Sequence, residues 1–221
     1  MSFLKLHPTS DEALRADIIR TSLKMNALGI NQGKSGNVSA RVDNGFLVTP
    51  TGIAYEHTRP GQIVAMRMDG SHDGDILPSS EWRFHRDIYA ARADVHAIVH
   101  THAPFATSLA CMDRGIPAFH YMVAAAGGVD IRCAPYATFG TQELSDLAVA
   151  ALRDRNACLL SHHGMIACGA DLEKALALAV EVESLARMYW QALQIGEPLL
   201  LSDAQMATVL QKFVSYGQQR G

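Results

Sequence analysis

The sequence lacks several features that would each have indicated a class of protein. Lysine and arginine number 19 against 22 aspartates and glutamates, so a formal net charge of −3 gives no basic excess for nucleic acid or an anionic membrane. No apolar run approaches the roughly 20 residues of a membrane span, and the N-terminus reaches charged residues without the apolar core of a signal peptide. We therefore expect a cytoplasmic protein with no nucleic-acid or membrane partner.

The sequence also lacks common motifs for cofactors and covalent catalysis. Its four cysteines lie far apart and form no Cys-x-x-Cys pair, which favours reduced, packed thiols over disulfides or metal ligands. Neither of the glycine-rich loops of nucleotide-binding proteins is present. All five lysines lie in polar or helix-face contexts, which argues against a lysine that forms a Schiff base with substrate.

The patterns that are present predict one domain, residues 1–221, of helices and a mainly antiparallel sheet. Two short apolar runs, 38–42 and 46–48, flank Asn44-Gly45 and predict a β-hairpin. Such an order of elements indicates an α/β (α+β) layered sandwich whose central sheet is flanked by helices. Expected helices are 10–28, 82–92 (with Ser80 as cap), 104–112, 144–152, 171–193 and 202–216, and further strands are 63–68, 97–102, 131–134, 157–161 and 165–168.

The apolar run Ala97–Val99 ends in His100-Thr101-His102. Residues two apart on a strand point to the same face, so both imidazoles would project together, as metal ligands do. Ten histidines in 221 residues give about 0.4 such pairs by chance, so the spacing needs support from elsewhere. Support comes from His162 or His163 at a second hairpin and from Glu81 at a helix start, since three imidazoles and a carboxylate form a zinc site. The same histidines also fit hydrogen-bonded polar residues at strand ends.

A second cluster is rich in hydrogen-bond donors and carries no net charge. Its members are small residues at turns or helix starts, where backbone N–H groups and hydroxyls can bind a phosphate. Each piece alone also fits an ordinary turn or cap. The residues are Gly36, Asn37, Thr51, Gly52, Ser79 and Ser80.

Together these residues resemble the class II, zinc-dependent aldolase family, which also contains ribulose-phosphate 4-epimerases and the adducin head. Within the family the pattern is most similar to that of the L-fuculose-1-phosphate aldolases. The resemblance is collinear over nearly the whole chain, in segments 28–33, 35–39, 49–53, 77–85, 99–102, 120–122, 124–128, 133–141, 162–164 and 216–217.

The resemblance implies a zinc ion, one per subunit, bound by His100, His102, His163 and Glu81. It selects His163 over His162 because the family's ligand directly precedes the glycine. Glu81 would also act as acid and base at the carbon that becomes C3 of dihydroxyacetone phosphate. The donor-rich cluster corresponds to the family's phosphate site.

The resemblance also implies residues that act between subunits. Tyr121 matches a tyrosine that reaches the neighbouring subunit's site and handles a proton there, and Tyr216 and Phe213 match a C-terminal segment, about 202–221, that closes over the aldehyde half. Phe139 is expected to line the same pocket. The implied assembly is a homotetramer with active sites at subunit interfaces. We expect His85, Arg83 and His120 to have packing or supporting roles, and the helical glutamates Glu181 and Glu183 to lie on a solvated face or in a subunit contact.

The reaction implied is reversible aldol cleavage of a ketose 1-phosphate, first of all L-fuculose 1-phosphate, to dihydroxyacetone phosphate and L-lactaldehyde. A 5-deoxyribulose- or 5-methylthioribulose-1-phosphate aldolase would need the same zinc and phosphate sites. L-ribulose-5-phosphate 4-epimerisation is an alternative, although the epimerase family's C-terminal histidine, glycine and paired tyrosines are replaced here by residues 213–217. A non-enzymatic, adducin-like interaction domain has no reason to keep all three histidines and Glu81.

Overall fold

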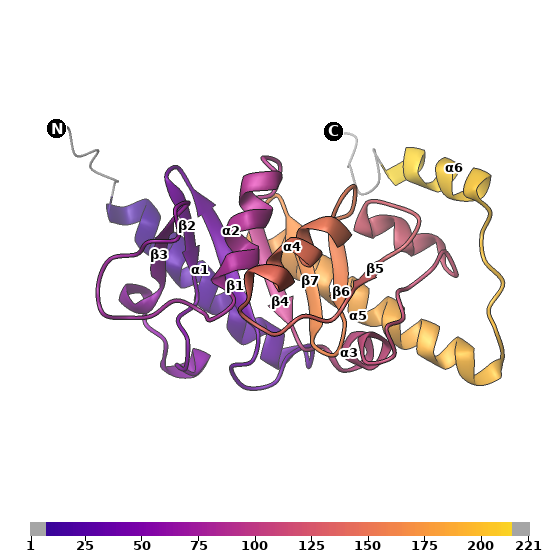
Figure 1. Ribbon diagram of the computed structural model, residues 1–221, viewed down its shortest axis with the longest axis horizontal. Coiled ribbons are helices and arrows are strands. Elements are labelled where there is room, and N and C mark those ends of the chain that lie inside the picture. Colours follow the sequence, from indigo (N-terminus) through magenta and orange to yellow (C-terminus); the bar gives the residue numbers. More distant parts are fainter. Residues whose placement is uncertain (1–7, 214–221) are drawn as a thin grey trace.

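The computed structural model describes residues 8–213, which form a seven-stranded sheet covered by helices (Figure 1). None of the helices in this part of the chain is both long and apolar enough to cross a membrane. The elements are α1 (Pro8–Ala27), β1 (Asn37–Val42), β2 (Gly45–Val48), the 3₁₀ turns η1 (Tyr55–His57) and η2 (Pro60–Gln62), β3 (Val64–Arg67), α2 (Trp82–Ala91), β4 (Ala97–Thr101), α3 (Pro104–Ala110), the 3₁₀ helix η3 (Tyr121–Ala126), β5 (Arg132–Ala134), α4 (Gln142–Ala151), β6 (Ala157–Leu160), β7 (Gly164–Gly169), α5 (Leu172–Ile195) and α6 (Asp203–Phe213).

The strands lie in the order β3-β2-β1-β4-β7-β6-β5, and every neighbouring pair is antiparallel except β5 and β6. The parallel pair follows from the connection, because β5 returns to β6 through helix α4 rather than through a hairpin. The prediction of a mainly antiparallel sheet flanked by helices is therefore confirmed. The Asn44-Gly45 hairpin is also present, with Val42 paired to Gly45.

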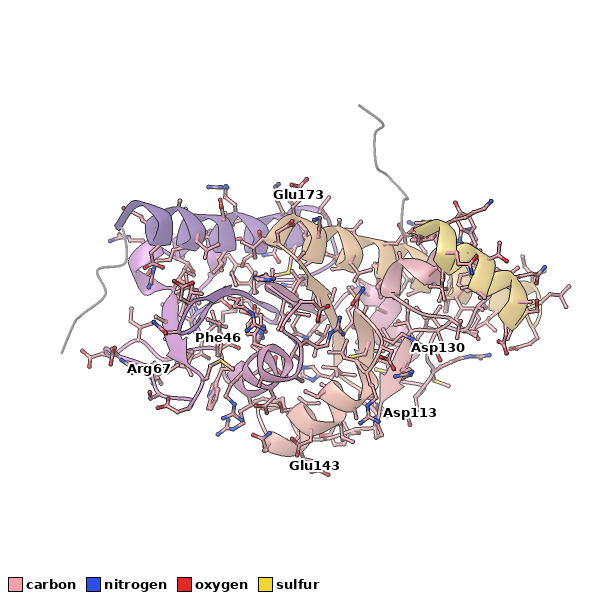
Figure 2. All side chains as sticks on the ribbon, turned by 90° about the horizontal axis from the view of Figure 1, so that it is seen from above. Phe46, Arg67, Asp113, Asp130, Glu143 and Glu173 are labelled. Carbon is pink, nitrogen blue, oxygen red and sulfur yellow. The ribbon has the colours of Figure 1, made fainter. Side chains whose placement is uncertain are left out.

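The sheet separates two hydrophobic cores. Odd-numbered Val99 of β4 packs on the side of α1 and α5, and even-numbered Ile98 packs on the side of α2 and α4. This alternation is the period-two geometry of a strand that is buried on both faces. Figure 2 shows the resulting three layers, with α1 and α5 along one face of the sheet and α2 and α4 along the other.

One local prediction is wrong, and one of the two alternatives for Glu183 is excluded. Ser80 does not cap α2: Glu81 occupies the N-cap position, and the Ser79 hydroxyl accepts the Glu81 N–H. Glu183 is not on a solvated face, because its carboxylate accepts the N–H groups of Phe105 and Ala106, each at 2.8 Å. Glu183 therefore caps the first turn of α3, whose free N–H groups attract an anionic acceptor.

Candidate active site

Three separate elements bring the predicted metal ligands together. His100 lies near the end of β4 and His102 directly follows the strand, His163 lies in the tight turn between β6 and β7, and Glu81 stands at the start of α2. Because β7 is paired antiparallel to β4, with Thr101 opposite Met165, the β6–β7 turn lies beside the histidine end of β4. The strand pairing thus places all three imidazoles at one edge of the sheet.

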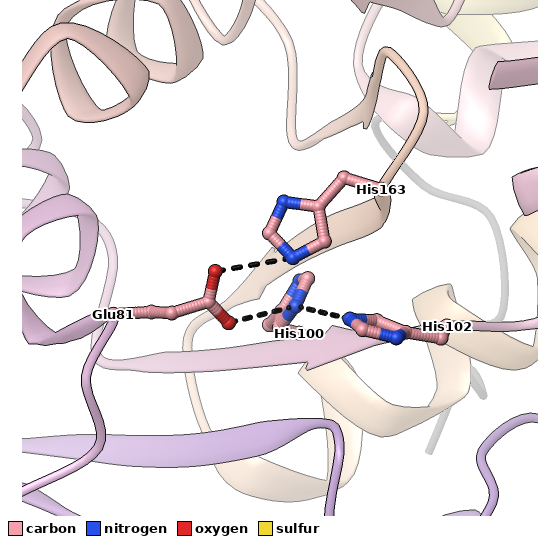
Figure 3. A group of neighbouring side chains, drawn as sticks. All are labelled: Glu81, His100, His102 and His163. Atoms are coloured by element: carbon pink, nitrogen blue, oxygen red, sulfur yellow. Dashed lines mark hydrogen bonds and ion pairs between the residues drawn. The ribbon is translucent and has the colours of Figure 1, made fainter. Parts of the chain in front are cut away.

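The four side chains converge on one point (Figure 3). Their nearest ligand atoms all lie within 4.8 Å of one another. Glu81 Oε2 is 3.1 Å from His100 Nε2, and Glu81 Oε1 is 3.1 Å from His163 Nε2. His100 Nε2 and His102 Nε2 are 3.2 Å apart, so the histidines present their Nε2 atoms to the same space.

This donor set fits a divalent cation. His100 Nδ1 lies 2.9 Å from the Met165 carbonyl, which can only accept, so Nδ1 carries a proton and Nε2 is the nitrogen presented to a metal. Lone pairs and a carboxylate that face one another repel unless a cation lies between them. Glu81 is buried, and its Oε1 faces His163 Nε2 at 3.1 Å, in the position that a shared cation would occupy between them. Three imidazole nitrogens and one carboxylate are the ligands that zinc uses at catalytic sites.

The electrostatics of the cluster favour the ligating forms of Glu81 and His102. Burial raises the pKa of the Glu81 carboxyl, but the charge of His100 and hydrogen bonds to His100 and His163 outweigh burial and hold that pKa far below its ordinary value. Burial, together with the charges of His100 and His163, lowers the pKa of His102 to about 4. At neutral pH Glu81 is thus ionised and His102 is neutral, as metal binding requires.

Two glycines permit the close approach of the segments around the cluster. A Cβ on Gly164 would lie 2.6 Å from the Thr101 carbonyl oxygen and 3.0 Å from His102 Cδ2. A Cβ on Gly36 would lie 2.5 Å from the His100 carbonyl oxygen. Any larger residue at either position would push a histidine-bearing segment away, which explains the glycine after His163 in physical terms.

A cavity of about 330 Å³ opens beside the cluster. The structure places the predicted residue Phe139 on its wall, and adds Tyr136, His162 and Ser35, which the sequence reasoning did not assign to the site. The ring of His162 stands edge-on to Tyr136, with 6.0 Å between centroids. Loop 138–141 is held against the start of α2, because Arg83 donates to the Gly140 carbonyl at 2.8 Å.

The donor-rich loops converge near the same cavity. An isolated bridge pairs Pro50 with Pro78, and the Ser79 N–H donates to the Thr49 carbonyl at 2.9 Å, so segments 49–52 and 77–80 run side by side. Lys34 Nζ donates to the Gly52 carbonyl at 2.8 Å, which attaches loop 33–37 to the same group. Lys34 was not predicted as a site residue, and it brings a positive charge to an otherwise neutral set of donors.

The remaining predicted site residues are more scattered. The Asn37 side chain is buried and bonded to Glu81 and to His85 rather than directed toward an open anion site. Tyr121 is 46% exposed at the start of η3, and Phe213 packs against the hydrophobic core on the α5 side; neither lines the cavity beside Glu81. Tyr216 lies outside the described residues.

Comparisons with known proteins agree with this geometry. Residues 16–190 match the family model of the class II aldolase and adducin N-terminal domain. The chain belongs to the class II aldolase and adducin family. It is 55% identical over 210 residues to a 5-methylthioribulose-1-phosphate/5-deoxyribulose-1-phosphate aldolase of Rhodospirillum rubrum, with 95% of each chain covered. It is 54% identical over 205 residues to an L-fuculose phosphate aldolase of Escherichia coli strain K12, with 92% of this chain and 95% of that protein covered.

The solved structures agree on the fold. An L-fuculose 1-phosphate aldolase superposes with a TM-score of 0.89 at 38% identity, over 91% of this chain and 96% of the other. The architecture is therefore the class II aldolase fold, and the protein is a class II aldolase, an aldehyde-lyase. Its Glu81–histidine cluster is consistent with the divalent metal site typical of this class.

Proposed function

We propose that this protein catalyses the zinc-dependent, reversible aldol cleavage of a ketose 1-phosphate to dihydroxyacetone phosphate and a small aldehyde. The observation that carries the proposal is the convergence of Glu81 and three histidines beside a cavity that borders donor-rich loops. A metal-ligand cluster alone would fit many hydrolases. The neighbouring loops with a lysine supply what a phosphorylated substrate needs, and the chain's close relatives act on ketose 1-phosphates by name.

The residue roles follow from chemistry and position. His100, His102, His163 and Glu81 would bind the zinc ion. When bound, the ion would act as a Lewis acid toward a substrate carbonyl oxygen. Glu81 is ionised and buried at the base of the cavity, so it is suited to accept and return the proton at the carbon that becomes C3 of dihydroxyacetone phosphate.

The phosphate would bind where loops 33–37, 49–52 and 77–80 meet. We assign Gly36, Thr51, Gly52, Ser79 and Ser80 to this site and leave Asn37 out of it, because both ends of the Asn37 amide are bonded to Glu81 and His85. Lys34 adds a cation on the outer side, where its ammonium is exposed and held by the Gly52 carbonyl. A fixed positive charge beside neutral donors favours a dianionic group over an uncharged hydroxyl.

The aldehyde half would lie against Phe139, Tyr136 and His162. We propose L-fuculose 1-phosphate as the first substrate to test, and 5-methylthioribulose 1-phosphate as the second. The second is favoured by the aromatic wall, since thioether sulfur makes favourable contacts with aromatic rings, and by the relative from Rhodospirillum rubrum. In a homotetramer, Tyr121 of a neighbouring copy would reach this half of the site and handle the proton on the aldehyde oxygen. The C-terminal segment with Phe213 and Tyr216 would close over the aldehyde half.

A coupled assay for dihydroxyacetone phosphate tests the proposal. The purified protein is given L-fuculose 1-phosphate, 5-methylthioribulose 1-phosphate, 5-deoxyribulose 1-phosphate and L-ribulose 5-phosphate, each with and without chelator. We expect release from at least one ketose 1-phosphate, loss of that release with chelator, and its return when zinc is added. The variant His102→Ala should lose bound zinc and activity, whereas His57→Ala, at an exposed position on η1, should keep both. Chelator-resistant cleavage, or epimerisation of ribulose 5-phosphate alone, would refute the proposal.

A further inference from the structure

A continuous row of buried polar side chains leads from Glu81 into the interface between α2 and the sheet. Asn37 Nδ2 donates to Glu81 Oε2 at 3.0 Å, and Asn37 Oδ1 lies 2.5 Å from His85 Nε2. His85 Nδ1 lies 2.7 Å from the Ser39 hydroxyl, which is 2.7 Å from the Tyr89 hydroxyl. All five side chains are buried, and those of Ser39 and His85 are completely so.

The row forms where one face of helix α2 packs against one face of strand β1. Glu81, His85 and Tyr89 are spaced by four and lie on one stripe of α2. Asn37 and Ser39 are spaced by two and lie on one face of β1, with Asn37 paired to His100 across the ladder. The other face of β1 carries Val38 and Ala40 into the core on the α1 side, so the polar stripe points toward α2.

The hydrogen bonds of this row can run in only one direction. An ionised carboxylate only accepts, so the Asn37 amide group must present its NH₂ to Glu81 and its oxygen to His85. The oxygen in turn requires a proton on His85 Nε2, which leaves a lone pair on Nδ1 in the neutral ring. Ser39 must then donate to Nδ1, and Tyr89 must donate to Ser39. Every proton in the row points toward Glu81.

The surroundings fix His85 in its neutral form. Burial, aided by the charge of His100, lowers the pKa of His85 to about 3, despite the opposing effect of Glu81. His85 Nδ1 faces the Ser39 hydroxyl, which can donate to it because Tyr89 supplies a donor to the Ser39 oxygen. The tautomer with its proton on Nε2 is the one that satisfies every member of the row.

We propose that His85 is a positioning residue: held as its Nε2–H tautomer by Ser39 and Tyr89, it sets the orientation of the Asn37 amide, which binds Glu81 Oε2 and leaves Oε1 facing the reaction. The inference deepens the proposed function and rests on the role of Glu81 in proton transfer. Its geometric support is that the Asn37 amide donates to Oε2, whereas Oε1 faces His163 Nε2, a predicted zinc ligand, at 3.1 Å. If the amide were reversed, its oxygen would face the carboxylate, and repulsion would move Glu81.

Nuclear magnetic resonance tests the tautomer directly. In ¹⁵N-labelled zinc-loaded protein at neutral pH, long-range ¹H–¹⁵N correlations distinguish Nε2–H from Nδ1–H, and the His85 signals are those that vanish in His85→Gln. We expect the Nε2–H pattern. An Nδ1–H pattern, or a doubly protonated ring, would overturn the proposal whether or not the protein proves to be an aldolase.

Steady-state kinetics at saturating zinc test whether the orientation of the Asn37 amide affects turnover. We expect Ser39→Ala to lower kcat about 10- to 100-fold, the usual effect of removing a group that orients a ligand, with KM changed by less than about threefold and zinc content kept. The matched control is Ser145→Ala, which removes another completely buried hydroxyl that bonds a residue of α2, Asp87, away from the row. Its kcat should be that of the wild type. Equal loss in both variants would mean that Ser39 matters only for folding.

A double-mutant cycle tests whether the effect passes through Asn37. If Ser39 and His85 act by orienting the Asn37 amide, Ser39→Ala should cost little further activity once Asn37→Ala has removed that amide. Multiplicative losses in the double variant would overturn the proposal. Absence of wild-type cleavage of every ketose 1-phosphate would instead defeat the proposed function, while the resonance measurement still decides the orientation of the row.

Discussion

The clearest quantitative prediction concerns Gly164, where the histidine-bearing segments approach most closely. In Gly164→Ala the new Cβ would lie 2.6 Å from the Thr101 carbonyl oxygen, about 0.8 Å short of the 3.4 Å at which ordinary contact begins, and 3.0 Å from His102 Cδ2. The carbonyl belongs to a paired strand, so relief must come from moving the β6–β7 turn or the end of β4. Overpacking of this kind costs about 1–3 kcal/mol.

Both ways of relieving the contact displace a metal ligand, since the turn carries His163 and the end of β4 carries His102. Because 1.4 kcal/mol corresponds to a tenfold change in an equilibrium constant, we expect zinc affinity to fall roughly five- to 150-fold. Chelator-buffered titration of the metal-free protein measures this affinity, and urea unfolding of the same protein measures the cost to the fold.

The matched control is Gly61→Ala, where a Cβ meets nothing within 4 Å. This variant should bind zinc as the wild type does. The reasoning is refuted if Gly164→Ala keeps wild-type zinc affinity, even with a loss of stability, because the strain would then not reach the histidines.

Three further predictions test other parts of the structure. Lys34→Met should raise KM for a phosphorylated substrate about two- to fivefold with kcat kept, and the difference from wild type should shrink at high salt, because the ammonium of Lys34 is exposed. The unfolded chain protonates His85 near pH 6.5, whereas the folded chain protonates it only near pH 3. The contribution of neutral His85 to the free energy of unfolding is therefore present above pH 6.5 and is lost by up to about 1.4 kcal/mol per pH unit as the pH falls toward 3. Urea titrations of metal-free wild type and His85→Gln at several pH values should show a different slope of stability against pH. Glu183→Gln should lower the free energy of unfolding by about 1–2 kcal/mol in urea, because the charge of Glu183 caps the first turn of α3.

Patterns within one element gave the reliable part of the sequence reasoning. The backbone conformation that Asn44-Gly45 favours is enough to predict the hairpin. Strand geometry is enough to predict that the side chains of His100 and His102 lie on the same face of the sheet. The choice of His163 over His162 needed the family resemblance, since adjacent histidines give no local reason to prefer either. The structure brings His163 to the cluster and turns His162 toward Tyr136.

Contacts between distant segments account for what the sequence did not reveal. Glu183 caps a helix nearly 80 positions earlier in the chain, and spacing within α5 says nothing about that partner. Lys34 reaches the carbonyl of Gly52 across two loops, and Tyr136 joins the cavity wall because β5 pairs with β6. Sequence periodicity describes which face a residue occupies, but it does not identify what lies opposite.

The row of polar side chains from Glu81 to Tyr89 could be predicted only in part, because the sequence shows the two polar stripes but not that they contact each other. Glu81, His85 and Tyr89 repeat every four residues on an otherwise amphipathic helix, while Asn37 and Ser39 alternate with apolar residues on a strand that is buried on both faces. Each unpaired polar group in such an interface costs about 1–3 kcal/mol, so two polar stripes inside a core are stable only when they satisfy each other. The two stripes therefore predict one another as partners, and their common end at Glu81 links the packing of α2 on the sheet to the orientation of the carboxylate. Substitutions in this interface should accordingly change turnover before they change zinc binding, since the Asn37 side chain bonds the Glu81 carboxylate and His85 and, among the described residues, has no hydrogen bond to the side chains of the three histidine ligands.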